Sequence, residues 1–129
     1  MTHVTGPFEV KMTPQADEGS PLGRMLLDKQ YHGDLEATSI GQMLAGMTAV
    51  TGSAGYVAME KVIGALDGRA GTFILMHMGV MDRGAQSLTI SVIPDSGTGE
   101  LEGLSGTMKI VMPDGKHAYE FDYELPATA

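Results

Sequence analysis

The stretch of sequence that most constrains the fold runs from residue 54 to residue 81 and reads AGYVAMEKVIGALDGRAGTFILMHMGVM. At its centre, Asp67-Gly68 separates two long runs that are rich in apolar residues. An Asp-Gly pair favours the two-residue type I′ turn because both of its positions tolerate a positive φ. The stretch therefore predicts an antiparallel β-hairpin, with one strand on each side of the turn.

Turn signals recur at similar spacing along the rest of the chain and divide it into eight segments. The segments leave no room for a crossover helix, so neighbouring strands should pair antiparallel. A second Asp-Gly pair at 114–115, preceded by Pro113, predicts another type I′ hairpin turn. The eight predicted strands are Val4–Met12, Gly23–Asp34, Thr38–Val50, Ala54–Leu66, Gly71–Met81, Gln86–Pro94, Glu100–Met112 and Lys116–Leu125.

The last segment shows the clearest alternation of apolar and polar residues. Tyr119, Phe121 and Tyr123 share one face, whereas Glu120 and Asp122 share the other. A period of two residues is typical of a strand that packs one face against a core. The segment is therefore predicted to be a strand with one dry face.

Two central segments are less regular. Gly71–Met81 carries apolar residues on both faces, which predicts a strand buried on both sides. Ser39–Gly46 allows a second interpretation as a short helix with Ser39 at its N-cap, because its apolar residues have helical spacing. Two glycines in that segment weaken a helix, so we favour the strand.

Eight antiparallel strands in hairpin order, without a repeat or a linker, predict a single all-β domain over residues 1–129. Closing such a sheet into an up-and-down β-barrel removes the exposed edges, and a two-sheet sandwich is the structural alternative. The interior of an eight-stranded barrel holds either packed side chains or one small ligand.

The charge balance excludes some partners. Eight basic and sixteen acidic residues give a net charge of −8. Binding to a phosphate backbone draws on positive charge, so we expect neither a nucleic acid nor a membrane as partner.

No run of residues approaches the 18 apolar positions of a membrane-spanning helix, and the N-terminal stretch lacks the pattern of a signal peptide. We expect a cytoplasmic protein.

Cysteine and histidine usage bears on cofactors and metals. The chain has no cysteine, which excludes disulfides and Cys-ligated zinc and fits a reducing compartment. Its four histidines lie far apart in sequence and match no metal-binding motif. We therefore predict no metal site and no cofactor.

Three polar residues, Lys29, Glu60 and His77, fall on otherwise apolar faces of their predicted strands. Burying a charge is costly unless the charge is paired. We therefore expect Lys29 to meet Glu60 across the lumen, directly or through His77 or water. Such a trio is either a satisfied core network or a set of ligand contacts, because ionisable groups in cavities are enriched at functional sites without being confined to them.

Several motifs, spread over nearly the whole chain, carry a family resemblance. A Gly-Ser-Ala-Gly-Tyr strand start at 52–56 precedes a Ser-Gly-Thr-Gly-Glu-Leu turn at 96–101. Together with Lys29–Glu36, Leu66–Arg69 and His117–Tyr123, they resemble the bacterial family catalogued as domain of unknown function 3224. The resemblance implies a closed barrel similar to that of allene oxide cyclase, and it implies no established activity. The residues that it places in common motifs include Lys29, Tyr56, Glu60, Arg69, His77 and Glu100.

These observations lead to one hypothesis and two alternatives. The lumen binds a small, largely apolar molecule through aromatic walls and some of the eleven methionines, whose flexible side chains suit an irregular pocket. Alternatively, the barrel is an isomerase or cyclase in which Glu60 or His77 moves a proton. In the third interpretation, the side chains of the barrel fill its lumen, and the protein serves as an oligomerisation module. A homo-oligomer is compatible with each reading, and the catalytic residues stay unassigned. The candidate ligand-binding residues are Lys29, Tyr56, Glu60, Arg69, His77, Glu100 and Tyr119.

Overall fold

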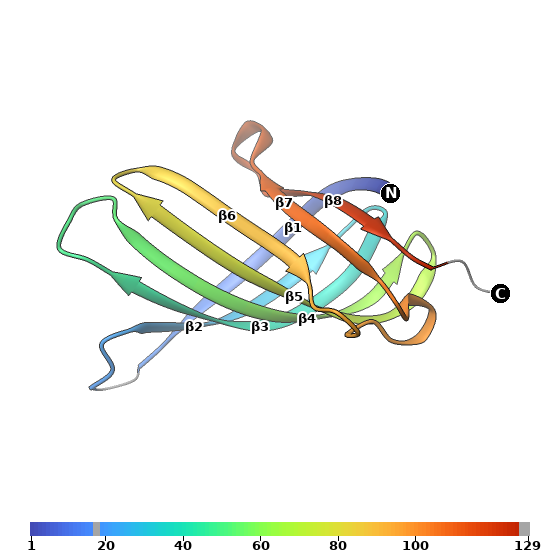
Figure 1. Ribbon diagram of the computed structural model, residues 1–129, viewed down its shortest axis with the longest axis horizontal. Helices are drawn as coiled ribbons and strands as arrows, with labels where there is room; N and C mark the ends of the chain where they lie inside the picture. The colour runs from blue at the N-terminus through green and yellow to red at the C-terminus, as the bar shows by residue number, and fades with distance from the viewer. Residues whose placement is uncertain (17–18, 127–129) are drawn as a thin grey trace.

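The computed structural model describes residues 1–16 and 19–126, which form a closed antiparallel β-barrel (Figure 1). Each strand pairs with the next one in the chain, and β1 also pairs with β8 to close the ring. The predicted all-β up-and-down barrel is confirmed, and the sandwich alternative is wrong. The strands are β1 (Thr2–Gln15), β2 (Gly23–Tyr31), β3 (Leu35–Met47), β4 (Ala54–Leu66), β5 (Arg69–Asp82), β6 (Ala85–Val92), β7 (Ser105–Val111) and β8 (Ala118–Glu124).

The hairpin between β4 and β5 forms as its sequence predicts. Leu66 pairs with Arg69, so Asp67 and Gly68 alone make the turn, and their φ angles are 49° and 80°. Both values lie in the left-handed region that a type I′ turn requires. Asp67 is further held by the hydroxyl of Tyr123, which donates a hydrogen bond to its carboxylate.

The second Asp-Gly pair does not form the predicted two-residue turn. The last pair between β7 and β8 joins Val111 to Ala118, and the connection contains the 3-10 turn η2 (Pro113–Gly115). Pro113 has no N–H to donate to a strand ladder, so pairing ends before it. Asp114 still has a positive φ of 53°, as its sequence predicts.

Two further sequence predictions need correction, and one alternative is excluded. The segment Glu100–Met112 begins with a 3-10 turn, η1 (Gly99–Leu101), and becomes a strand only at Ser105. The alternative helix at Ser39–Gly46 is absent, because these residues lie inside β3. β5 is not buried on both sides: Met76 and Met78 are 41% and 55% exposed, since no second layer of the described chain covers the outer face of the sheet.

The barrel is packed at one end and open at the other. β5 and β6 pair over the whole of β6, whereas β6 pairs with β7 only at Ile90 and Ser91. The part of β6 before Ile90 therefore has a free edge, and the sheet splays apart there (Figure 1). At the packed end, Leu101 and Leu104 from the loop after β6 are buried among the inward side chains.

That packed end holds the hydrophobic core. Alternate positions of all eight strands point into it, which accounts for the alternating burial of each strand. Within the described residues, no helix is both long and apolar enough to cross a bilayer. The buried core residues are Val4, Phe8, Tyr31, Leu35, Ala37, Val62, Leu66, Phe73, Leu75, Ile90, Val92, Leu101, Leu104, Met108, Tyr119, Phe121 and Tyr123.

Candidate functional site

A buried carboxylate, that of Glu60, lies at the boundary between the packed and the open halves of the barrel. Lys29 Nζ lies 2.7 Å from Glu60 Oε2, and His77 Nε2 lies 2.6 Å from the same oxygen. The other oxygen, Oε1, accepts hydrogen bonds from the Tyr31 hydroxyl and from Ser39 Oγ, the latter at 2.8 Å. Lys29, Glu60 and His77 therefore meet inside the barrel, in a cluster completed by Tyr31 and Ser39.

The cluster is electrostatically satisfied. Burial alone would raise the pKa of Glu60, but the hydrogen bond from His77 and the positive charge of Lys29 outweigh it and lower the pKa to about 2. The carboxylate is therefore ionised at neutral pH. Lys29 gains further stabilisation from the rings of Phe8 and Tyr31, whose centroids lie 5.4 Å and 5.8 Å from its Nζ. Burial and the neighbouring carboxylate raise the pKa of Tyr31 well above 10, which keeps its hydroxyl a donor.

The ionised carboxylate fixes the tautomer of His77. A carboxylate only accepts hydrogen bonds, so Nε2 must carry the proton that it shares with Glu60. In the neutral imidazole, Nδ1 is then the acceptor. Within the described chain, no partner bonds to Nδ1, although the His77 side chain is only 4% exposed. In that neutral form, His77 offers one free acceptor to the space around it.

That space is a cavity of about 190 Å³ inside the barrel. A second depression of about 330 Å³ covers the inner surface of the splayed strands and shares Met43 and Tyr56 with the first. The inner cavity alone is below the roughly 300 Å³ of common ligand sites, and the two together exceed it. The lining of the inner cavity is mainly apolar and consists of Phe8, Val10, Met12, Leu27, Lys29, Met43, Tyr56, Ala58, His77, Ile110, Met112 and His117.

Tyr56 stands where the two depressions meet. Burial, together with the charge of Glu60, raises the pKa of its hydroxyl, which stays protonated at neutral pH. None of the described residues forms a hydrogen bond with this hydroxyl. Tyr56 therefore adds a second free polar atom to the lining of the lumen.

Two glycines make room for these side chains. A Cβ at Gly41 would lie 2.8 Å from Glu60 Cβ and closer still to the backbone of β4, so only glycine lets the carboxylate sit there. A Cβ at Gly79 would lie 2.2 Å from the Tyr56 ring, which covers that position. Both glycines are required by close approach rather than by their φ angles.

The remaining predicted residues lie away from this cavity. Arg69 and Glu100 are exposed at the packed end, where Glu100 Oε1 accepts a hydrogen bond from the Ala70 N–H at 3.2 Å. The Tyr119 hydroxyl donates to the His32 carbonyl at 2.7 Å and accepts from the Leu35 N–H at 2.9 Å. Tyr119 thus ties the turn between β2 and β3 to the core, and none of the three lines the lumen.

Sequence reasoning did not assign a role in the site to Tyr31 and Ser39. Both occupy inward positions, Tyr31 two residues after Lys29 and Ser39 at the position that pairs with Lys29 across β2 and β3. The signal was available in the alternation of the strands. A polar residue such as Ser39 on an inward face needs a partner, and Glu60 was the predicted inward acceptor.

The fold and site define a class of protein: a small up-and-down β-barrel whose half-open lumen is lined by Lys29 and His77, both bonded to a buried, ionised carboxylate. Within that class, the family model described as "Protein of unknown function (DUF3224)" matches residues 4–123, and the chain belongs to this family. The resemblance inferred from the sequence motifs is therefore confirmed.

A similar solved structure comes from the same family. It is the crystal structure of a protein of unknown function from Shewanella oneidensis MR-1, with 51% sequence identity and a TM-score of 0.94. The match covers 99% of this chain and 99% of that chain. No curated protein matches the sequence.

Proposed function

We propose that this barrel binds a small, largely apolar molecule in its open half, with the polar end of the ligand facing His77 and Tyr56. One observation carries the proposal: in an apolar cavity, His77 Nδ1 and the Tyr56 hydroxyl have no partner in the described chain. Ligand sites typically combine apolar walls with a few polar groups that fix orientation. A ligand hydroxyl would suit both atoms, because it can donate to Nδ1 and accept from Tyr56.

Glu60 supports the site without contacting the ligand in this proposal. Its two oxygens already accept four hydrogen bonds, so it orients His77 and Lys29 instead. The third reading, a barrel filled by its own side chains, fits the packed end only. The hollow at the other end favours ligand binding over that reading.

A fluorescence titration with N-phenyl-1-naphthylamine, an apolar probe with one N–H donor, tests the proposal. The wild-type protein should bind it saturably, and His77→Gln should weaken binding by about 1–3 kcal/mol because Nδ1 is lost. The matched control is His3→Gln, which changes an exposed histidine at the packed end. Absence of saturable binding, or equal affinity in the folded His77→Gln variant, would contradict the proposal. Native mass spectrometry of the purified protein would reveal any co-purified molecule.

A second candidate function is proton transfer in an isomerase or cyclase, and the state of the cluster favours His77 over Glu60 as the base. Glu60 has a pKa of about 2 and no free lone pair directed at the cavity, whereas His77 Nδ1 is free. In such a reaction, Nδ1 takes a proton from a carbon next to a carbonyl and returns it to another carbon. Tyr56 would donate to the enolate oxygen.

Hydrogen–deuterium exchange at the α-carbons of cyclohexanone in D₂O, followed by NMR, tests this second candidate. Exchange should be faster with the wild-type protein than with His77→Gln, and His3→Gln should behave as the wild type. Equal rates for the wild type and His77→Gln would leave ligand binding as the proposed function.

A further inference from the structure

The outer face of the sheet carries an apolar patch where a solvent-facing strand is normally polar. The patch covers the outward positions of β3, β4 and β5, and its most exposed member, Ile40, has 71% of its surface accessible. We call this set the outer apolar patch. Its members are Ile40, Leu44, Val57, Met59, Ile63, Met76, Met78 and Val80, each at least 41% exposed.

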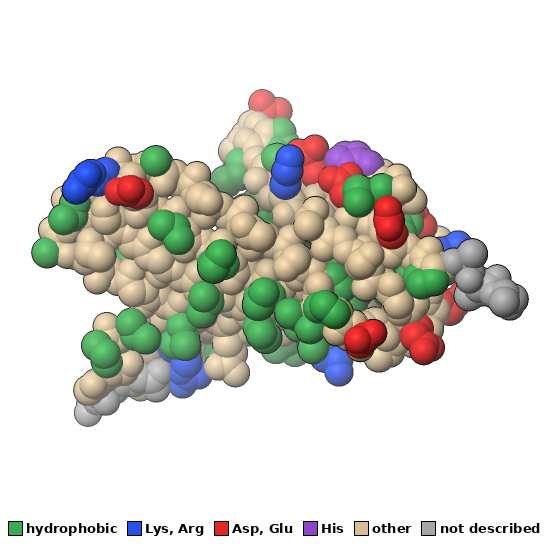
Figure 2. Space-filling model, viewed as in Figure 1, with side chains coloured by type: hydrophobic (Ala, Val, Ile, Leu, Met, Phe, Trp, Pro, Cys, Tyr) green, Lys and Arg blue, Asp and Glu red, His purple; other side chains and the backbone are tan. Residues whose placement is uncertain are grey.

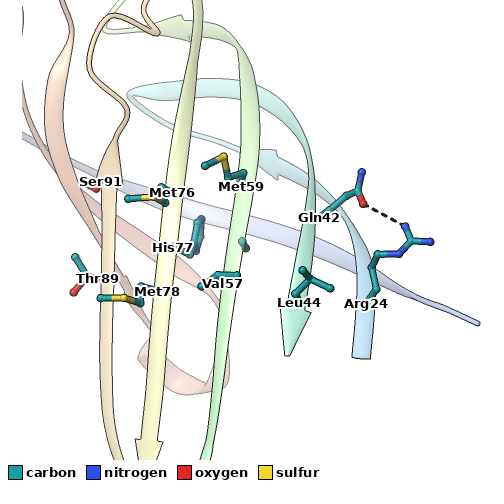
Figure 3. Close-up of a pocket in the computed structure, with 11 residues that line it drawn as sticks. Arg24, Gln42, Leu44, Val57, Met59, Met76, His77, Met78, Thr89 and Ser91 are labelled. Carbon is teal, nitrogen blue, oxygen red and sulfur yellow. Dashed lines mark hydrogen bonds between the residues drawn. The ribbon is translucent and has the colours of Figure 1, made fainter. Parts of the chain in front are cut away.

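The members of the outer apolar patch are contiguous. Met59 pairs directly with Met76 across β4 and β5, and Val57 pairs with both Met78 and Leu44. Figure 3 shows these five side chains along three neighbouring strands, beside a groove of about 360 Å³. Methionine side chains are unbranched and adaptable, so a surface rich in them conforms to an opposing surface.

The size of the outer apolar patch is that of a protein interface. Eight large side chains, each about half exposed, present roughly 800 Å², more than the roughly 300–600 Å² of the largest patch on a typical monomer. A standard protein–protein interface buries about 800 Å² on each partner. The patch alone therefore supplies the area that one side of a stable dimer needs.

The charge distribution favours a second copy of this chain as the occupant. Two molecules with a charge of −8 repel each other least when they meet through a face without acidic groups. The face consists of the outward positions of residues 40–44 in β3, 57–63 in β4 and 74–80 in β5, all of which the structure describes. Lys61 is the one charged residue among these positions.

Acidic side chains gather elsewhere, chiefly at the end of the barrel that carries the termini (Figure 2). Asp28 on β2 and Asp82 on β5 stand at the rim of the patch, so each copy carries a lysine within the patch and carboxylates at its rim. A polyanion or an anionic lipid surface would meet Lys61 within the patch and Arg24 at its edge beside Leu44, against the −8 of the whole chain.

We propose that two copies of this chain form a symmetric dimer by packing their outer apolar patches, sheet against sheet, with both lumens left open to solvent. An interface that uses the same patch on both subunits is the geometry of a two-fold dimer. The lumen opening lies on the inner side of the same strands, so the dimer contact and the ligand site are on opposite faces of the sheet.

Sedimentation velocity on the full chain tests the dimer. The wild type should sediment as a dimer at micromolar concentration, and Met59→Lys/Met78→Lys should raise the dissociation constant at least about 100-fold, because it buries like charges at the centre of the contact. Thr107→Lys is the matched control, since Thr107 is exposed on β7, outside the patch. A monomeric wild type, or a double variant that still dimerises, would overturn the proposal, as would loss of the dimer in the control.

A second measurement covers the case in which the double variant does not fold. The chain has no cysteine, so Met59→Cys and Thr107→Cys each introduce a unique thiol. A short thiol-reactive bismaleimide should cross-link Met59→Cys into dimers and leave Thr107→Cys monomeric. Absence of cross-linking in Met59→Cys would contradict the dimer. Flotation of a monomeric wild-type protein with neutral phosphatidylcholine vesicles would assign the patch to a lipid surface and overturn the proposal.

Discussion

Replacing Lys29 by methionine tests whether the ion pair at the centre of the barrel stabilises the fold. The change keeps an unbranched side chain, one atom shorter than that of lysine, but leaves the ionised Glu60 carboxylate buried without its cation. Breaking a buried ion pair in this way costs about 3–5 kcal/mol. We expect a loss near the lower value, about 3 kcal/mol, because Tyr31, Ser39 and His77 still donate to the carboxylate.

The companion variant Glu60→Gln leaves Lys29 unpaired and should cost a similar amount. In the double variant Lys29→Met/Glu60→Gln both charges of the pair are removed, and the amide oxygen can still accept from Tyr31 and Ser39. The double variant should therefore recover most of the loss and show a coupling of at least about 2 kcal/mol between the two sites.

Urea unfolding measures the double-mutant cycle, and far-UV circular dichroism follows it because the chain lacks tryptophan. All variants are compared at one fixed protein concentration, because dimerisation affects apparent stability. Lys109→Met, an exposed lysine on β7, is the control and should change the free energy of unfolding by less than about 0.5 kcal/mol. Single-variant effects that add within about 0.5 kcal/mol would show that Lys29 and Glu60 do not interact.

Three other predictions concern the same barrel. The pKa of Glu60 is lowered from 4.5 to about 2 in the folded state, so its contribution of about 3 kcal/mol is present above pH 4.5 and is lost as the pH falls towards 2. Acid titration of unfolding should therefore show a steeper loss in the wild type than in Glu60→Gln, and parallel curves would refute the assignment. Gly79→Ala should displace the Tyr56 ring, destabilise the protein by about 1–3 kcal/mol and weaken probe binding. The control Gly55→Ala should be tolerated, because its Cβ would lie 3.7 Å from the nearest atom. Tyr119→Phe removes two hydrogen bonds at the β2–β3 turn and should cost about 1–3 kcal/mol in thermal or urea unfolding without changing probe affinity.

The architecture was predictable from sequence because it rests on local signals. The Asp67-Gly68 turn and the alternation of the strands determine which neighbours pair and which faces point inward. The same alternation placed Lys29, Glu60 and His77 inside the barrel, and the structure brings them together.

The parts that sequence reasoning missed depend on tertiary context. Alternation reports that a face is apolar but not whether another layer covers it, so Met76 and Met78 were expected to be buried and are exposed. The opening of the barrel likewise follows from the short pairing of β6 with β7, which leaves no local signature. Arg69 and Glu100 were grouped with the lumen residues on family motifs alone, and a linear motif does not show at which end of a barrel its residues lie.

The cluster around Glu60 also bears on how eight strands choose their alignment. A strand shifted by two residues keeps every apolar side chain on the inner face, so alternation alone cannot distinguish that alignment from the native one. The four donors to Glu60 come from β2, β3 and β5, while the carboxylate itself is on β4. A shift between any two of these strands would separate a donor from the carboxylate and leave a buried polar group unsatisfied. One side chain thereby discriminates against misaligned barrels that hydrophobic burial alone would accept.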